Sequence, residues 1–258
     1  EFIRAIRRVI RAPRFALAVV ASVGIAVGPI LISFSVFEAV FLRNMTAKSP
    51  ERLVTLHSVR GERGQRAPVS RGLSFPDFED VRTALPRDAW RFLTAWKTRD
   101  VTAHTEAGEQ ALRIALVTGD YFQIADARFI SGYPTEDRGT GIVVTRALRT
   151  RLGGESASAS LTIQGERFEI GGVVDDEFHG LYSSEGIDAW IPLSELPRLD
   201  RSANVLAYRE LEDLSVVVES TADVNVEAFA PLAAAVGRGL MEFHGGERFA
   251  WHVESSPA

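Results

Sequence analysis

One long apolar stretch near the N-terminus, residues 15–42, constrains this chain more than any other feature. Glu38 is the only charged residue in these 28 positions, and five arginines precede them in residues 1–14. The apolar core of a bilayer is crossed by about 20 residues in a helix, so the stretch is long enough to span a membrane with some tilt. Because basic residues collect on the cytoplasmic side of a span, the arginines predict a cytoplasmic N-terminus.

Two shorter features flank or lie within this stretch. Residues 1–14 carry apolar side chains on one side and arginines on the other, which predicts an amphipathic elbow on the inner membrane surface, broken at Pro13. Gly24 and Gly28 stand four residues apart, a spacing that lets two helices approach closely in lipid, so they are candidates for helix packing. A cleavable signal peptide is the alternative, but its apolar region is only about 7–15 residues long and ends at a small-residue site, which residues 36–42 lack.

Residues 43–258 form a chemically different part of the chain. The first 42 residues carry a net charge of +3, so the remainder carries −8 to give the total of −5. This remainder is long enough for a hydrophobic core of its own, which predicts a water-soluble domain outside the cytoplasm. An acidic domain without a basic stripe does not suit nucleic-acid binding. The absence of cysteine excludes disulfides and thiolate metal sites.

Short strands and a few helices alternate along residues 43–258, which predicts an α+β fold, a mixed α/β domain with two subdomains. Helices are expected at residues 74–84, with Ser74 as N-cap, at 145–152, ended by Gly153 and Gly154, and at 226–243. Residues 60–71 are expected to form a loop, Gly108 with Glu109 a turn, and residues 164–166 the turn of a hairpin between strands at 160–163 and 168–174. Strands are expected at residues 53–59, 92–96, 101–105, 111–117, 141–144, 160–163, 168–174, 189–193, 214–219 and 248–253.

Six short motifs follow one another along the chain. The first joins residues 34–43 to residues 50–54, and the second is Phe75, Pro76, Asp77 and Phe78. The others are Gly119 with Tyr121 and Phe122; residues 143–165, with Gly153, Gly154 and Gly165; residues 168–173 with 178–180; and Trp190, Ile191, Pro192 and Leu193. Each motif is weak by itself, but their order and their spread over nearly the whole chain make a specific pattern.

This ordered series resembles the permease subunits of ABC transporters that carry a MacB-like periplasmic core domain. The resemblance implies a bacterial inner-membrane protein in which residues 43–258 form the periplasmic domain. It also implies a homo- or hetero-dimer with a related permease chain, and an ATP-binding partner subunit. ATP would be bound by that partner, while this chain would hold no catalytic residue, cofactor or metal. Members of the family export macrolides, peptides or toxins, or release lipoproteins.

Three departures from the family pattern indicate a divergent member. Residues 44–48 replace a proline-rich segment, Asp126 stands where a glycine is common, and Asp175 with Asp176 replaces a proline-containing turn. The family's second membrane helix would begin near Ala258, so we expect a fragment or a single-span relative. The sequence contains no glycine-rich nucleotide loop.

No catalytic or metal-binding pattern stands out in the sequence. The five histidines lack the spacing of zinc ligands, and no G-x-S-x-G nucleophile motif occurs. Asp175, Asp176, Glu177 and His179 form the densest group of potential ligands, but they fall in a turn, which favours a solvated acidic turn. Two other functions stay open: a membrane-anchored periplasmic binding or scaffold protein derived from such a permease, and a membrane-anchored hydrolase, whose only support is the size of the domain.

Overall fold

The computed structural model describes residues 47–62, 69–105, 108–132, 141–153, 160–182, 185–221, 226–241 and 249–257. The chain separates into two units, Glu1–Asn44 and Met45–Ala258, and all described residues belong to the second. The predicted elbow, the predicted span at 15–42, Gly24 and Gly28 therefore lie outside the described residues. Within the described ranges, no helix is both long and apolar enough to cross a membrane.

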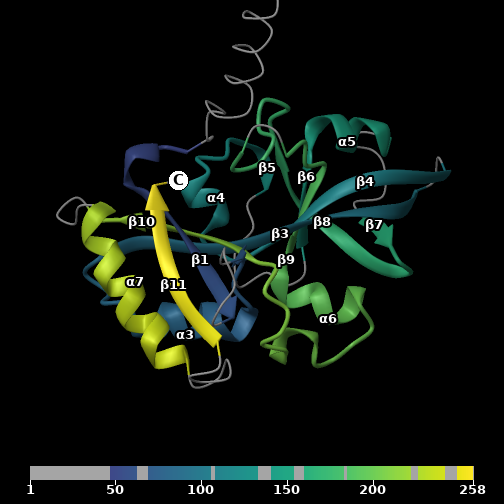
Figure 1. Cartoon of the computed structure of the whole chain (residues 1–258). Helices are drawn as coiled ribbons and strands as arrows, with labels where there is room; N and C mark the ends of the chain where they lie inside the picture. The colour runs from purple at the N-terminus through teal and green to yellow at the C-terminus, as the bar shows by residue number, and fades with distance from the viewer. Residues whose placement is uncertain are drawn as a thin grey trace, which may run out of the picture. The chain divides into compact units, whose positions relative to one another are not determined.

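The second unit is built on a single mixed sheet with helices packed against it (Figure 1). Its strands are β1 (Leu53–Glu62), β2 (Val69–Arg71), β3 (Trp90–Thr105), β4 (Gly108–Val117), β5 (Phe129–Gly132), β6 (Gly141–Thr145), β7 (Ser160–Ile163), β8 (Glu166–Val174), β9 (Ala189–Pro192), β10 (Ser215–Ser220) and β11 (Phe249–Pro257). Its helices are η1 (Pro50–Arg52), α3 (Phe75–Ala84), α4 (Tyr121–Ile124), α5 (Arg146–Arg151), η4 (Leu193–Glu195), α6 (Leu196–Leu199), η5 (Val205–Ala207) and α7 (Val226–Leu240).

The strands lie in the order β11-β1-β10-β3-β4-β9-β6-β8-β5, with β2 beside β1 and β7 beside β3 and β8. Most neighbours are antiparallel, and the pairs β4–β9 and β6–β8 are parallel. Strands and helices are mixed along the chain in this way, so the expected mixed α/β class is confirmed. The described part of the unit is one compact body, where the sequence suggested two subdomains.

Successive side chains along the strands of the sheet belong to two separate hydrophobic clusters. On β10, Val216 and Val218 belong to one cluster and Val217 to the other, and β4 and β9 alternate in the same way. Since successive side chains of a strand point to opposite faces, the two clusters lie on opposite faces of the sheet. Helices α3 and α7 pack on the first face, through Phe78 and Phe229 among others. We call this the aliphatic face.

The opposite face is covered by the single turn of α4 and by Phe178, Leu181, Tyr182 and Ile187 from the chain between β8 and β9. It buries the aromatic side chains Trp96, Tyr121, Phe122, Phe178 and Trp190. We call this the aromatic face.

The helix starts agree with the sequence patterns. The Ser74 hydroxyl accepts a hydrogen bond of 3.2 Å from the backbone N–H of Asp77, which makes Ser74 the N-cap of α3. Thr145 caps α5 in the same way, with the N–H of Leu148 donating to its hydroxyl at 3.1 Å. Gly153 follows α5 with a φ of +100°, the left-handed conformation expected after a helix end, while Gly154 lies outside the described residues.

The hairpin between β7 and β8 is also confirmed. Its two turn residues, Gln164 and Gly165, have φ values of +52° and +87°. Two successive positive φ angles match the turn that follows the natural twist of a two-residue hairpin.

Three sequence predictions were wrong in detail. Residues 92–96 and 101–105 are not two strands but parts of β3, because the four polar residues between them, 97–100, stay in register with β4, where Asp100 pairs with Arg113 at 2.7 Å. Gly108 and Glu109 belong to β4 rather than to a turn. The predicted loop at 60–71 contains the end of β1 and the strand β2, and residues 58–60 of β1 pair with β2 as well as with β11.

The chain enters and leaves this unit at neighbouring points. Strand β1 is the first strand, β11 is the last, and the two are antiparallel neighbours. Val54, near the start of β1, lies opposite Pro257, near the end of β11 (Figure 1). The start of β1 and the end of β11 therefore lie on the same side of the unit.

Candidate functional site

Residues from three of the six motifs meet on the aromatic face. Tyr121 and Phe122 come from α4, Phe178 from the loop after β8, and Trp190 from β9. The ring centroids of Phe178 and Trp190 are 5.0 Å apart, and those of Phe122 and Trp190 are 6.0 Å apart. These three motifs, although distant in sequence, therefore supply one packed cluster. The aromatic positions in them hold the fold together.

The Tyr121 hydroxyl connects α4 to the loop that covers the aromatic face. It accepts a hydrogen bond of 2.9 Å from the backbone N–H of Leu181. Burial raises the pKa of Tyr121 well above its usual range, and the nearby carboxylate of Glu185 raises it further. The phenol therefore stays neutral at physiological pH and is unsuited to proton transfer there.

Glu185 places a half-buried carboxylate beside these aromatic rings. The indole N–H of Trp96 donates to its Oε1 at 3.0 Å, and the backbone N–H of Tyr182 donates to its Oε2 at 3.4 Å. Burial raises the pKa of Glu185, while these two hydrogen bonds act in the opposite direction. Gly180 allows this approach, because a Cβ there would stand 2.6 Å from Oε2. The sequence analysis missed Glu185, since nothing in its local pattern marks a carboxylate that is buried by distant residues.

The second motif anchors α3 and a distant loop. Asp77 is fully buried, and its carboxylate accepts a hydrogen bond of 2.6 Å from the Ser74 hydroxyl. The Arg209 guanidinium donates to the carboxylates of both Asp77 and Asp80, with a distance of 2.7 Å to Asp80. Pro76 lies in the first turn of the helix, and Phe78 packs on the aliphatic face. The motif therefore acts as a helix start and as an attachment point for residues 205–214.

The remaining motif positions lie at turns and strand ends. Gly119 lies in the turn before α4, Gly165 lies in the β7–β8 hairpin, and Pro192 ends β9 and precedes η4. Asp126, where a glycine is common in the family pattern, has a φ of +48°. A left-handed backbone explains that glycine preference, and aspartate is among the few other residues that tolerate it.

The acidic turn after β8 serves structural contacts. Asp175 pairs with Arg146 at 2.8 Å, and Asp176 accepts a hydrogen bond of 2.7 Å from the backbone N–H of Ala147 in the first turn of α5. His179, the fourth member of the group, is exposed. Among the residues that the structure describes, no group of three or more histidine, aspartate or glutamate side chains is arranged to hold a metal ion.

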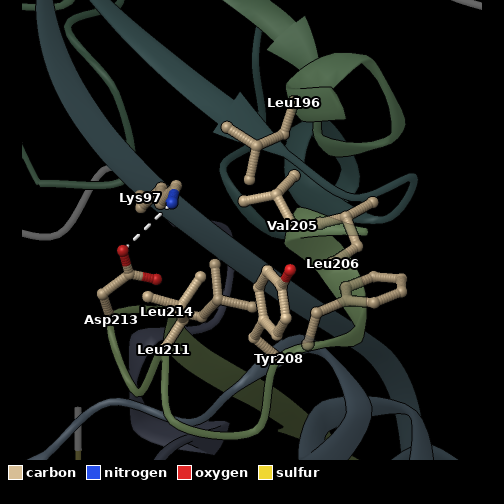
Figure 2. Close-up of a pocket in the computed structure, with 9 residues that line it drawn as sticks. Lys97, Leu196, Val205, Leu206, Tyr208, Leu211, Asp213 and Leu214 are labelled. Atoms are coloured by element: carbon tan, nitrogen blue, oxygen red, sulfur yellow. Dashed lines mark hydrogen bonds and ion pairs between the residues drawn. The ribbon is translucent and has the colours of Figure 1, made fainter. Parts of the chain in front are cut away.

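A small recess lies where α3 meets the segment between β9 and β10 (Figure 2). It has room for about one water molecule. Lys97 and Asp213 pair across one side of it at 3.0 Å. The lining residues are Phe75, Lys97, Leu196, Val205, Leu206, Tyr208, Leu211, Asp213 and Leu214. A recess of this size does not enclose a substrate.

Three solved structures share the arrangement of the fold. The first is a domain of a protein from Porphyromonas gingivalis described as a permease, with a TM-score of 0.66, 14% identity, and coverage of 82% of this chain and 92% of that one. The second is the periplasmic region of MacB from Actinobacillus actinomycetemcomitans, with a TM-score of 0.54, 14% identity, and coverage of 78% and 87%. The third is the extracellular domain of the noncanonic ABC-type transporter YknZ from Gram-positive bacteria, with a TM-score of 0.55, 13% identity, and coverage of 79% and 99%.

These similarities show that the chain shares its fold with these three domains, and within that fold the aromatic motif residues of this chain are buried in its core. The sequence profile of the MacB-like periplasmic core domain matches residues 16–235, and the chain belongs to this family. No curated protein matches the chain.

Proposed function

We propose that this chain is a non-catalytic component of an ABC-type permease of the MacB-like class, which couples a cytoplasmic ATPase to an extracytoplasmic domain in export or lipoprotein release. The family membership carries this proposal. The antiparallel pairing of β1 with β11 is compatible with it, because this pairing places both ends of the described domain on one side. The ATP-binding site belongs to the partner subunit in this proposal, and the domain transmits movement.

The decisive experiment is affinity purification of the tagged full chain from native membranes in mild detergent, followed by mass spectrometry. Recovery of an ATP-binding subunit in stoichiometric amount is the expected result. Recovery of periplasmic or membrane proteins without any ATPase would overturn the permease proposal and favour an anchored scaffold.

The proposed topology has a cytoplasmic N-terminus and an extracytoplasmic domain. The chain has no cysteine, so single cysteines report cleanly on either side of the membrane. Ser194 is exposed in the domain, and Ala5 lies in the predicted elbow. A membrane-impermeant maleimide should label Ser194→Cys in intact spheroplasts and label Ala5→Cys only after lysis. Labelling of Ala5→Cys in intact spheroplasts would contradict this topology.

The predicted dimer rests on the small-residue spacing of Gly24 and Gly28. Replacing both with leucine would keep helices apart if these residues pack against a partner helix. We expect the double variant to lose chemical cross-linking between copies in native membranes while keeping its membrane insertion. Unchanged cross-linking would place the dimer contact elsewhere.

A further inference from the structure

Two large apolar side chains project from one turn near the recess. Tyr208 is 49% exposed and Leu211 is 40% exposed, and Ile130 on β5, at 46%, is the third such residue in the described part of the chain. The backbone N–H of Leu211 donates to the carbonyl of Tyr208 at 3.4 Å, which closes the turn. We call residues 208–211 the docking turn. Tyr208 and Leu211 both border the recess in Figure 2.

The docking turn is held firmly by the residue between its two apolar side chains. Arg209 points back onto α3, where it binds Asp77 and Asp80. On the far side of the turn, the Lys97–Asp213 pair joins the loop to β3, and Leu214 exchanges two backbone hydrogen bonds with Leu73. Because these contacts fix the backbone, Tyr208 and Leu211 lose little conformational freedom on binding a partner. Such preorganised apolar groups, tyrosine above all, are typical of binding hot spots.

The charge around the docking turn is negative. Glu210 is exposed within it, and Arg209 is bound by two carboxylates, so these three side chains keep a net charge of −1. Lys97 and Asp213 neutralise each other. A second copy of this acidic domain would bring like charge to the turn, and an anionic membrane surface would be repelled as well. The complementary occupant is a basic segment with apolar side chains.

The position of the docking turn leaves it accessible to such a partner. Strand β10 follows the turn, and its pairing runs from Val216 opposite Leu56 to Glu219 opposite Leu53. The turn therefore precedes the end of β10 that lies away from Leu53, where the chain enters the unit (Figure 1).

We propose that Tyr208 and Leu211 are the apolar anchors of a docking surface for an extracytoplasmic protein segment that carries apolar side chains flanked by lysine or arginine. The surface does not depend on coupling to an ATPase, so failure of the permease proposal and failure of this one are separate outcomes.

The test uses the full chain in phosphatidylcholine nanodiscs and two fluorescent synthetic peptides. One peptide has two leucines flanked by arginines, and the other has the same leucines flanked by glutamates. Fluorescence anisotropy should show binding of the arginine peptide, with empty nanodiscs as the baseline. We expect Tyr208→Ser and Leu211→Ser each to weaken binding by at least about tenfold. Ile130→Ser, which removes an equally exposed apolar side chain from β5, should leave the affinity unchanged.

Charge reversal in the docking turn separates recognition from damage to the fold. Glu210→Lys should weaken binding of the arginine peptide and strengthen binding of the glutamate peptide, an exchange that an unfolded variant cannot produce. Absence of binding, equal affinity for both peptides, or an equal loss in Ile130→Ser would overturn the proposal. Self-association of the wild type in sedimentation, lost in Tyr208→Ser, would also overturn it in favour of a second copy as the occupant.

Discussion

The two faces of the sheet are filled by different means. The aliphatic face is covered by α3 and α7, and most of its buried residues are valine, leucine and isoleucine. The aromatic face has no long helix in the described part of the chain, and α4 supplies only Tyr121–Ile124. Its volume is filled by large rings instead, each of which buries about 150–250 Å². A sheet face without a long helix can therefore still be shielded from water, provided that its side chains are large.

This difference explains where the family motifs fall. Tyr121, Phe122, Phe178 and Trp190 fill the aromatic face together, so a change at one position leaves a gap that the others cannot close. The aliphatic face is less demanding, because branched aliphatic residues of similar volume replace one another with little loss. Aromatic residues of three motifs follow this pattern, while the second motif contributes Phe78 to the aliphatic face.

The largest effect should come from removing a ring from the aromatic face. Trp190→Ala is expected to lower the free energy of unfolding by about 3–5 kcal/mol, because the cavity is lined by other rings and cannot collapse. Ile114→Val, on the aliphatic face of β4, should cost only about 0.5–1.5 kcal/mol. Both free energies are measured by denaturant unfolding, followed by the circular dichroism of the backbone because this signal does not depend on the mutated tryptophan. Equal losses in the two variants would remove the distinction between the faces.

The second-largest loss of stability should come from removing a polar contact of α3, the helix that packs on the aliphatic face. Asp77→Ala removes the partner of the Ser74 hydroxyl and one of the two carboxylates that bind Arg209. We expect a loss of about 2 kcal/mol, since the buried Ser74 hydroxyl loses its acceptor while Arg209 keeps Asp80 as a partner. Asp77→Asn keeps an oxygen acceptor and should lose less. A smaller loss in the alanine variant than in the asparagine variant would contradict this account.

Removing the charge of Glu185 on the aromatic face should increase the free energy of unfolding, whereas the two changes above should lower it. Its folded pKa is raised by burial, so the folded state holds the proton more tightly than the unfolded state, and its contribution to stability falls as pH rises through that range. Glu185→Gln removes this penalty at neutral pH and keeps an acceptor for the Trp96 indole. We expect a gain of about 1 kcal/mol, or roughly 2–4 °C in Tm.

The pH dependence of that gain is its control. Below about pH 4 the wild-type side chain is protonated in both states, so the two proteins should converge in stability. A difference in Tm that is independent of pH would show that packing, rather than ionisation, separates them.

The smallest effect should come from a surface ion pair. Arg82 and Glu79 lie 2.6 Å apart on the solvent side of α3, and both side chains are well exposed. Arg82→Ala should change the free energy of unfolding by less than about 0.5 kcal/mol, because water and salt screen such pairs. A loss comparable to that of Asp77→Ala would mean that burial does not govern the ion pairs of this helix.

Local signals in the sequence were sufficient for the starts of α3 and α5 and for the β7–β8 hairpin. Ser74, Thr145 and Gly165 act within a few residues of their own position, through a cap or a turn conformation. The mixed α/β class followed from the same local patterns. The resemblance to the MacB-like core domain rested on motif order, and the family profile confirms it over residues 16–235.

The tertiary structure alone decided the rest. The continuity of β3 across Asp100 depends on Arg113 in the neighbouring strand, and the burial of Glu185 depends on Trp96, 89 positions away in sequence. The exposure of Tyr208 and Leu211 likewise follows from Arg209 being drawn onto α3 across more than a hundred positions. Such pairings are made between segments that no short window of sequence contains, so only the folded chain shows which polar groups are buried and which apolar groups remain outside.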